Sequence, residues 1–363
     1  MIRARAACGG MVALAALGAW RAAPFVAQDP VYPGREWETI SPADAGFSAA
    51  TLDSVRMRLA SMNTTALMVI KAGKVVFSYG DVVRTSYIAS VRKSVLSMLI
   101  GIHEARGEIP LDATIGALGI DDLGGLTAGE KEATVRDLLS ARSGVYHPAS
   151  NGGDDVDSTF VRGSHAHGTF FVYNNWDFNA LGTIFERTTR LNIYDALEQE
   201  IARPIGMQDF ARAAQLRLGD TTRSQHLAYH MWLSTRDMAR VGYLMLREGR
   251  WRDRQLVPRA WIARSTHAAT PLGEMNPPRM REWRFGYGYL WWVWDGPRAT
   301  GEWAGAFTAM GAYGQFITVL PRLDLVVVHK TAVSPERTVD DNDYLRVLRQ
   351  IVAGYRGALA PPG

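Results

Sequence analysis

The sequence predicts an α+β fold in which one antiparallel β-sheet is flanked by helices and carries an inserted, mainly helical lobe. Strand-like runs of β-branched and aromatic residues occur towards both ends of the chain, between positions 66 and 79 and between positions 287 and 329. The chain between them has helical spacing of apolar residues and long polar loops. We therefore expect a sheet lobe formed by about 45–105 and 226–356, and a helical lobe at about 106–225.

Residues 1–27 have the features of a secretory signal peptide. Two arginines precede an apolar, alanine-rich segment at 11–20, and small residues follow up to Ala27. The apolar segment is too short to span a bilayer. We expect cleavage near Ala27, a single domain at 28–363, and a periplasmic or secreted location. An uncleaved anchor is the alternative, because no position has small residues at both sites that cleavage requires.

Composition and charge indicate an ordinary globular protein. The chain has 363 residues, of which 47% are hydrophobic and 21% are charged. Its formal net charge is +4, and removal of the signal peptide, which holds three arginines and no acidic residue, would lower it to +1. A charge this small argues against a nucleic-acid partner. Cys8 is the single cysteine, so the processed domain would have neither a disulfide nor a thiol nucleophile.

The first elements of the domain are predicted to be a helix, a hairpin and a second helix. Residues 49–62 have amphipathic helical spacing. Strand-like runs at 66–70 and 75–79 are joined by a short turn with one glycine, which predicts a β-hairpin. The next helix begins at Ser90 and ends near Gly107. It is apolar nearly all round, so we expect other elements to cover it.

The predicted helical lobe contains short helices and one long loop. Residues 134–139 and 176–189 have helical spacing, and Ser143-Gly144 follows the first of them as a stop signal. The loop at about 146–168 is rich in Gly, Asp, Ser and His. A loop of this length inside a compact domain is more often functional than idle.

The last part of the chain returns to strands. Runs at 287–294, 311–320 and 325–329 are typical of consecutive antiparallel strands, and a helix at 343–355 would cover them. The three tryptophans of the first run fit a strand with one face in the core, although one of them could also form a wall of a pocket.

Ser90 and Lys93 are the first candidate catalytic residues. Three positions apart on a helix, their side chains lie on one face, so the amine can reach the hydroxyl. A serine hydroxyl needs a base to become a good nucleophile, and a desolvated lysine can act as one. Arginine could not, and only five of the 40 Lys and Arg residues are lysines. The alternative is a serine that caps the helix beside a solvated lysine.

Two further motifs could complete such a site. Tyr173 and Asn175 form a Tyr-x-Asn sequence at the start of the 176–189 helix. A phenol can pass protons to and from a lysine, and an amide can hold both an amine and a substrate carbonyl. Gly311 lies in a glycine-rich stretch that opens a strand-like run, where a glycine lets a substrate approach the backbone closely. Taken alone, the Tyr-x-Asn sequence is more typical of a helix start with a packed tyrosine.

Ser90-x-x-Lys93, Tyr173-x-Asn175 and the glycine-rich strand at Gly311 resemble, in this order, the β-lactamase-related serine hydrolases. That superfamily includes class C β-lactamases, DD-peptidases, related esterases and 6-aminohexanoate-dimer hydrolases. The resemblance runs from about residue 46 to residue 355. It implies a β-lactamase/transpeptidase-like fold and a small-molecule ester or amide substrate, with no cofactor.

The resemblance also implies roles for individual residues. Ser90 would be acylated, and Lys93 and Tyr173 would form its proton-transfer network, with the choice of immediate base left open. The backbone N–H groups of Ser90 and Ala312 would bind the oxyanion. The expected substrate contacts are Asn175, Gly311, Ala312 and, as a looser candidate from the long loop, Tyr146.

One departure from the family pattern concerns the third motif. It usually begins with Lys or His, but Ala309 occupies that position here. The cation that would help to bind a carboxylate is therefore missing, unless an arginine from elsewhere replaces it. We expect an uncharged ester or an aminohexanoate-type amide as the substrate. The alternatives are β-lactamase or DD-peptidase activity, or a non-catalytic binding protein of the penicillin-recognising type.

Other chemistries have weaker support. No Gly-x-Ser-x-Gly sequence occurs, so there is no candidate for a nucleophile elbow. His165-x-His167 lies near His147 and near three aspartates of the long loop, but this spacing matches no familiar metal site. We expect no metal, no stable membrane insertion and no nucleic-acid partner, and the sequence leaves the oligomeric state open. The three aspartates are Asp154, Asp155 and Asp157.

Overall fold

The computed structural model describes residues 30–153 and 160–357. The predicted signal peptide at 1–27 lies outside the described residues. Contacts group Val31–Gly363 into one compact unit. No helix among the described residues is long and apolar enough to cross a membrane.

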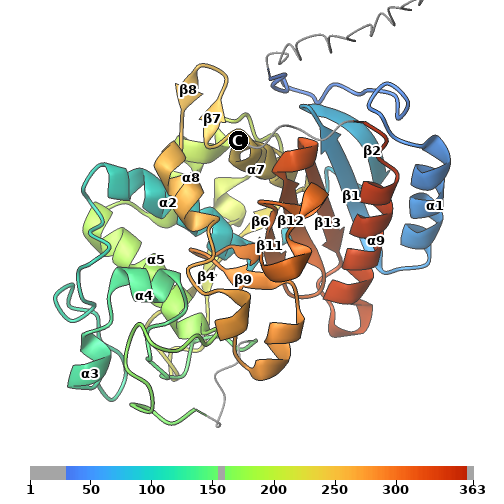
Figure 1. Cartoon of the computed structure of the whole chain (residues 1–363). Coiled ribbons are helices and arrows are strands. Elements are labelled where there is room, and N and C mark those ends of the chain that lie inside the picture. Colours follow the sequence, from blue (N-terminus) through green and yellow to red (C-terminus); the bar gives the residue numbers. More distant parts are fainter. Residues whose placement is uncertain (1–29, 154–159, 358–363) are drawn as a thin grey trace, which may run out of the picture. The chain divides into compact units, whose positions relative to one another are not determined.

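One antiparallel sheet is assembled from segments near both ends of the described chain, and its strands β1, β2, β12 and β13 lie on one side of this unit (Figure 1). Its strands run in the order β2, β1, β13, β12, β11, β10 and β9, and each neighbouring pair is antiparallel. The predicted α+β class is therefore confirmed. The strands are β1 (Thr64–Lys71), β2 (Lys74–Gly80), β9 (Phe285–Tyr287), β10 (Trp292–Trp294), β11 (Phe307–Gly311), β12 (Gln315–Leu320) and β13 (Leu325–Thr331).

The predicted hairpin at the start of the domain is β1 and β2. Ala72 and Gly73 form its turn, with φ of 50° and 83°, which matches the twist of the two flanking strands. On its other side β1 pairs with β13, so that Val69 lies opposite Val327. The first and last strands of the domain are thus hydrogen-bonded neighbours.

Helices cover both faces of the sheet. On one face α7 (Thr235–Leu246) packs closely, because a Cβ added to Gly242 would lie 2.5 Å from Cγ1 of Val326. On the other face lie α1 (Ala49–Ala60) and α9 (Asp341–Ala353). Tyr344 of α9 stacks on Phe316 of β12 with ring centroids 4.1 Å apart. These contacts hold the sheet between two apolar layers.

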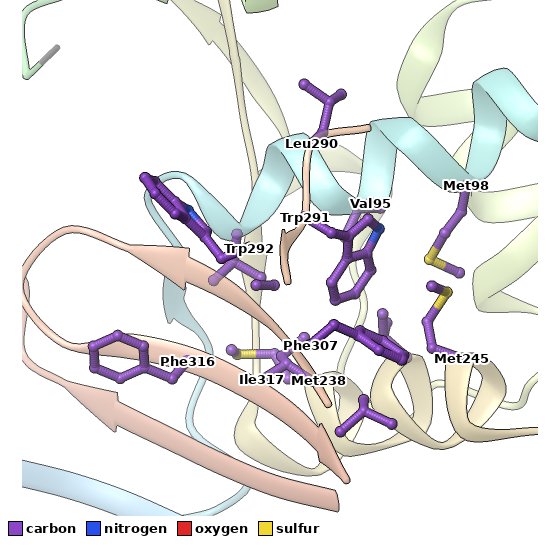
Figure 2. Packing of buried hydrophobic residues seen from close by; sticks show 14 of the residues in the cluster. Val95, Met98, Met238, Met245, Leu290, Trp291, Trp292, Phe307, Phe316 and Ile317 are labelled. Carbon is purple, nitrogen blue, oxygen red and sulfur yellow. The ribbon is translucent and has the colours of Figure 1, made fainter. Parts of the chain in front are cut away.

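Helix α2 (Val91–Ala105) is central, as its apolar sequence predicts. Every residue from 91 to 103 is buried. Figure 2 shows Val95 and Met98 of α2 facing Met245 of α7, Phe307 of β11 and Trp291, which precedes β10. The helix therefore lies in the core, where its first turn can be held rigidly.

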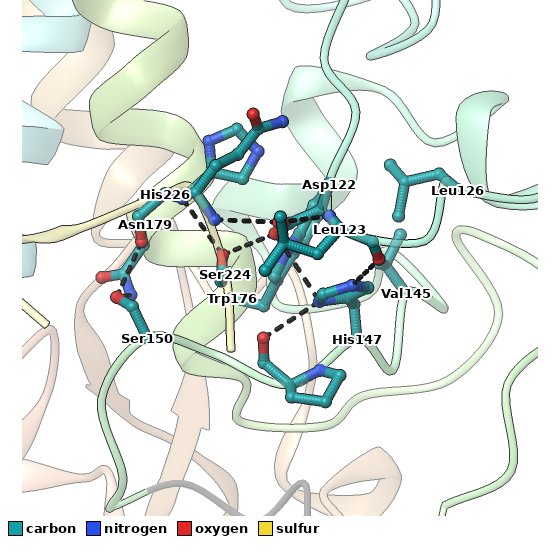
Figure 3. Close-up of polar contacts among 12 residues, drawn as sticks. Asp122, Leu123, Leu126, Val145, His147, Ser150, Trp176, Asn179, Ser224 and His226 are labelled. Carbon is teal, nitrogen blue, oxygen red and sulfur yellow. Dashed lines mark hydrogen bonds and ion pairs between the residues drawn. The ribbon is translucent and has the colours of Figure 1, made fainter. Parts of the chain in front are cut away.

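Residues 106–225, where a helical lobe is predicted, contain helices and a buried carboxylate. Asp122 accepts hydrogen bonds from Nε1 of Trp176, at 2.6 Å, and from the hydroxyl of Ser224 and the backbone N–H of Gln225 (Figure 3). Burial opposes its charge, but these donors keep the pKa of Asp122 below its usual value. The helices of this part of the chain are α3 (Ala128–Lys131), α4 (Val135–Leu139), α5 (Asn175–Thr189), α6 (Ile193–Ala196) and the π-helix Leu197–Ala202.

The remaining elements are two-stranded ribbons and one helix. Strand β3 (Ser86–Tyr87) pairs with β6 (Trp232–Leu233), β4 (Leu216–Leu218) with β5 (Ala228–His230), and β7 (Arg250–Trp251) with β8 (Arg254–Gln255). Helix α8 (Arg259–Ser265) packs on α2, where a Cβ on Gly101 would overlap the ring of Trp261.

Two strand predictions were wrong in their boundaries. The run at 287–294 is not one strand, because the chain reverses between β9 and β10 through Leu290, whose φ is 65°. The run at 311–320 is also divided, because Gly311 ends β11 and a turn containing Tyr313, with φ of 69°, leads into β12. A hydrophobic run does not reveal a turn made by left-handed residues other than glycine.

Candidate active site

Ser90 lies at the N-terminus of α2, directly after a sharp turn. Ala89 before it has a φ of 47°, in the left-handed region that a residue with a side chain seldom adopts. The Ser90 side chain makes no capping hydrogen bond. The capping alternative is therefore wrong, and the hydroxyl is available for another partner.

That partner is Lys93, which lies at the centre of the site. Its Nζ is 2.9 Å from Oγ of Ser90, 2.6 Å from the hydroxyl of Tyr173 and 2.7 Å from Oδ1 of Asn175. Its side chain is 2% exposed. The rings of Tyr173 and Phe178 lie 4.2 and 4.4 Å from the nitrogen. The alternative of a solvated lysine is therefore wrong.

The start of α5 positions Tyr173 and Asn175. The side chain of Asn174 caps this helix, accepting from the N–H of Trp176 at 2.9 Å, and Trp176 is in turn held by Asp122. Nδ2 of Asn175 donates to the carbonyl of Gly152 at 2.9 Å. Asn175 therefore links Lys93 to the long loop. It does not line the cavity at Ser90, where a substrate contact was predicted.

Gly311 brings the end of β11 against the nucleophile. A Cβ at this position would lie 2.6 Å from the carbonyl oxygen of Ile88 and 3.1 Å from the backbone nitrogen of Ser90. No side chain fits in that space, so a glycine is required. Gly311, Ala312 and Ser90 all line one cavity. The structure thus shows a close approach of the turn at Ser90 to this glycine, and the predicted close approach of a substrate stays a prediction.

The cavity at Ser90 has a volume of about 400 Å³, and four aromatic residues contribute to a mixed polar and apolar lining. Trp292 forms part of its wall and stacks on Tyr173, with ring centroids 5.4 Å apart. Most of the other lining side chains were not predicted from the sequence, because they come from separate segments that no spacing rule connects. They are Arg279, Met280, Trp283, Met310, Tyr313, Thr338, Val339, Asp340 and Asp341.

Tyr146 and Ala309 lie apart from this cavity. Tyr146 is 5% exposed, its hydroxyl bonds Nδ1 of His165 at 2.9 Å, and burial raises its pKa to about 12. Ala309 is fully buried opposite Ile317, and it is its neighbour Met310 that lines the cavity. The described lining does contain one cation, Arg279, from a different segment.

Arg92 is a second buried cation beside the site. It is 1% exposed, and its guanidinium lies 4.6 Å from the centre of the Tyr229 ring. Among the described residues no acidic side chain forms an ion pair with it. Burial opposes its charge, but Tyr229 and Tyr87 keep the pKa of Arg92 above its usual value. Sequence reasoning missed this residue, although it lies inside the Ser-x-x-Lys motif.

The histidines of the long loop have separate partners. His147 bonds the carbonyls of Pro148 and Leu123, and His167 bonds Asp137 at 3.0 Å. Within the described ranges no three His, Cys, Asp or Glu side chains cluster as metal ligands would. Asp154, Asp155 and Asp157 lie outside those ranges.

A family model described as Beta-lactamase matches residues 54–350, which is most of the chain. This chain belongs to the beta-lactamase family. An uncharacterised protein of Alkalihalophilus pseudofirmus is 30% identical over 106 residues, which is 27% of this chain and 29% of the relative. The match thus spans less than a third of that relative.

Solved structures with the same fold include several hydrolases and a penicillin-binding protein homologue. A protein named as a 6-aminohexanoate-dimer hydrolase of Bacillus anthracis has a TM-score of 0.65 and 19% identity, over 88% of this chain and 86% of its own. EstCE1, a hydrolase with promiscuous acyltransferase activity, has a TM-score of 0.61 and 16% identity, and the match covers 85% of this chain and 98% of its own. The penicillin-binding protein homologue from Caulobacter crescentus has a TM-score of 0.62 and 14% identity, and the match covers 84% of this chain and 97% of its own. At these identities the likeness shows the fold alone.

In this member of the beta-lactamase family the geometry can support nucleophilic catalysis. A hydroxyl, an amine and a phenol are in hydrogen-bond contact, which is the arrangement that lets a proton leave a nucleophile and reach a leaving group. The helix N-terminus at Ser90 favours negative charge near its backbone N–H groups.

Proposed function

We propose that this chain is an exported serine hydrolase that cleaves an ester or amide bond through an acyl-enzyme on Ser90. The contact of Lys93 with both Ser90 and Tyr173, at 2.9 and 2.6 Å, carries this proposal. A protein that only binds its ligand has no need of an amine and a phenol at the same serine. The family membership supports the same reaction class.

The reaction follows from the positions of these groups. Oγ of Ser90 attacks the carbonyl carbon, and its proton passes to the network of Lys93 and Tyr173. The backbone N–H groups of Ser90 and Ala312 stabilise the oxyanion that forms. The network returns the proton to the leaving alcohol or amine as the bond breaks. Water then attacks the acyl-enzyme with the same groups acting as base, and a carboxylic acid is released.

The preferred substrate is proposed to lack a carboxylate next to the scissile bond. Ala309 supplies no cation, and Arg279, the one cation of the described lining, is outnumbered there by Asp340 and Asp341. Trp283, Trp292 and Tyr313 add aromatic surface to the walls. Aromatic walls bind apolar acyl or alcohol groups through buried area. Esters and linear amides fit this lining better than carboxylate-bearing β-lactams.

The test is intact-mass spectrometry after brief exposure to a short-chain p-nitrophenyl ester, a cephalosporin or a linear amide. We expect an acyl adduct or turnover with the ester or the amide, and neither in Ser90→Ala. Reaction with the cephalosporin alone would favour the β-lactamase or DD-peptidase alternative. No adduct and no turnover with any of the three would favour the binding-protein alternative.

Export is proposed from the sequence at 1–27, and the test is cell fractionation of the full-length chain. We expect the protein outside the cytoplasm and shortened by about the length of that segment. A full-length protein recovered in the membrane fraction would support the uncleaved anchor instead.

A further inference from the structure

A second cavity, of about 480 Å³, shares no lining residue with the cavity at Ser90. Five arginines from four segments line it, and Glu36 is the one acidic side chain in its lining. The described segments are the start of the domain, the end of the π-helix, α7 and the turn between β7 and β8. Their arginines are Arg35, Arg203, Arg236, Arg240 and Arg252.

Arg240 is the buried part of this lining. It is 1% exposed and donates to the carbonyls of Ile205, Gly34 and Arg35, each at 2.8 Å. Its Nε has no hydrogen-bond partner, and no acidic side chain of the described chain forms an ion pair with it. Burial lowers the pKa of Arg240, and the charges of Arg236 and Arg252 add to this lowering. The charges of Asp237 and Glu36 oppose it.

Pairing neutralises only part of the remaining charge. Arg236 binds Asp209 through two hydrogen bonds of 2.7 and 2.6 Å and also contacts Glu36 at 3.2 Å. Arg203 has a solvent-exposed pair with Glu198 at 3.1 Å. For Arg35 and Arg252 the described residues offer no acidic partner. The cavity lining therefore has an excess of positive charge, to which the buried guanidinium of Arg240 contributes.

Arg252 also adopts an unusual backbone conformation. It lies in the turn of the β7 to β8 ribbon with a φ of 56°, where glycine or asparagine is favoured. Its Nη2 donates to the carbonyl of Pro33 at 3.3 Å, which holds the side chain against the start of the domain. This turn sets an arginine at the edge of the cavity at some conformational cost.

We propose that this cavity binds a phosphate-bearing anion, either a small soluble phosphate compound or the headgroup of an anionic phospholipid. Guanidinium groups match phosphate oxygens with paired hydrogen bonds, and several of them favour an anion with more than one charge. The cavity is larger than a phosphate ion needs, which leaves room for the rest of a ligand. This proposal does not depend on the proposed hydrolase activity.

The test measures binding of inorganic phosphate and pyrophosphate to the full chain by calorimetry. A second arm measures cosedimentation with phosphatidylglycerol vesicles, with phosphatidylcholine vesicles as the neutral reference. The double variant Arg35→Gln with Arg252→Gln removes the two exposed cations that lack acidic partners. Arg254→Gln is the control, because Arg254 is exposed on the same ribbon but does not line the cavity.

We expect the double variant to weaken binding by at least about tenfold, and Arg254→Gln to leave it unchanged. Binding of the soluble phosphates without vesicle binding identifies a soluble ligand. Binding confined to phosphatidylglycerol vesicles identifies a lipid headgroup. Absence of binding in both arms overturns the proposal, and so does an equal loss in Arg254→Gln, which would mean diffuse attraction to a basic surface. Ester hydrolysis by the double variant should equal that of the wild type, so that a failure here is separate from a failure of the hydrolase proposal.

Discussion

The amine of Lys93 lies 2.6 Å from the hydroxyl of Tyr173, although the two residues are 80 positions apart in the chain. Helix α2 holds the lysine and the start of α5 holds the tyrosine, so the contact joins two buried helices. Because Asn175 also accepts from the same nitrogen, the amine has a fixed direction relative to Ser90.

Replacing Lys93 with arginine should abolish acylation without unfolding the protein. A guanidinium keeps a positive charge in this buried position but does not accept a proton at neutral pH. We expect a loss of at least about a hundredfold in ester hydrolysis, the size of a general-base contribution. Initial rates of ester hydrolysis measure the loss of activity, and the circular-dichroism spectrum checks that the variant is folded. A variant that retains most of the wild-type rate would exclude Lys93 as part of the proton network.

Replacing Gly311 with alanine should impair both catalysis and stability. The new Cβ would meet the carbonyl of Ile88 at 2.6 Å and the nitrogen of Ser90 at 3.1 Å, so the strand or the turn at Ser90 must move. We expect a destabilisation of about 1–3 kcal/mol, as for other overpacked sites, and a lower kcat. Urea unfolding and ester kinetics measure these. Gly273→Ala is the matched control, because a Cβ there meets no atom within 4 Å.

Replacing Met310 with lysine should shift the preference towards carboxylate-bearing substrates. Met310 lines the cavity, whereas Ala309 is buried and would place an ammonium in the core. A cation in the cavity attracts a substrate carboxylate. The ratio of kcat/KM for a cephalosporin to that for a neutral ester should rise about tenfold, the effect of one charged hydrogen bond, and should not rise in Met310→Leu. An unchanged ratio in the lysine variant would mean that charge at this position does not set the preference.

Arg92 should influence catalysis through its charge. It is a buried cation next in sequence to Lys93, and removing it would make protonation of the neighbouring amine easier. In Arg92→Met we expect the acidic limb of the kcat/KM profile to move to higher pH. Arg92→Lys should restore most of the wild-type profile, because it keeps the charge. A purely structural role would lower the rate at every pH and leave the limb in place.

Part of this site could be predicted from sequence, and part could not. Ser90 and Lys93 could be paired because helix geometry fixes side chains three positions apart, and Gly311 could be linked to them through the family resemblance. The cavity walls were beyond such rules, because Trp283 and Asp340 meet only through the tertiary fold. Tyr146, predicted from the long loop, does not line this cavity, for a related reason. A loop's composition suggests function but does not indicate which of its side chains turn inward.

His329 should make the stability of the protein depend on pH. It is fully buried on β13, where Nδ1 contacts the carbonyl of Gly314 and Nε2 the hydroxyl of Thr64, both at 2.8 Å. A neutral imidazole satisfies both contacts, donating to the carbonyl and accepting from the hydroxyl. Burial lowers the pKa of His329 to about 4, below its ordinary value of 6.5.

Because the folded pKa of His329 lies below the unfolded one, acid favours the unfolded chain. The contribution of His329 to the free energy of unfolding should be fully present above about pH 6.5. It should be lost as the pH drops towards 4, and the loss should reach up to about 3 kcal/mol. Urea titrations at pH 8, 6 and 5 measure the loss. In His329→Gln the amide can keep one of the two contacts but cannot be protonated, so its stability should depend less on pH. An equally steep dependence in this variant would assign the effect to other groups, of which His230, with a pKa also lowered to about 4 by burial, is the first to replace next.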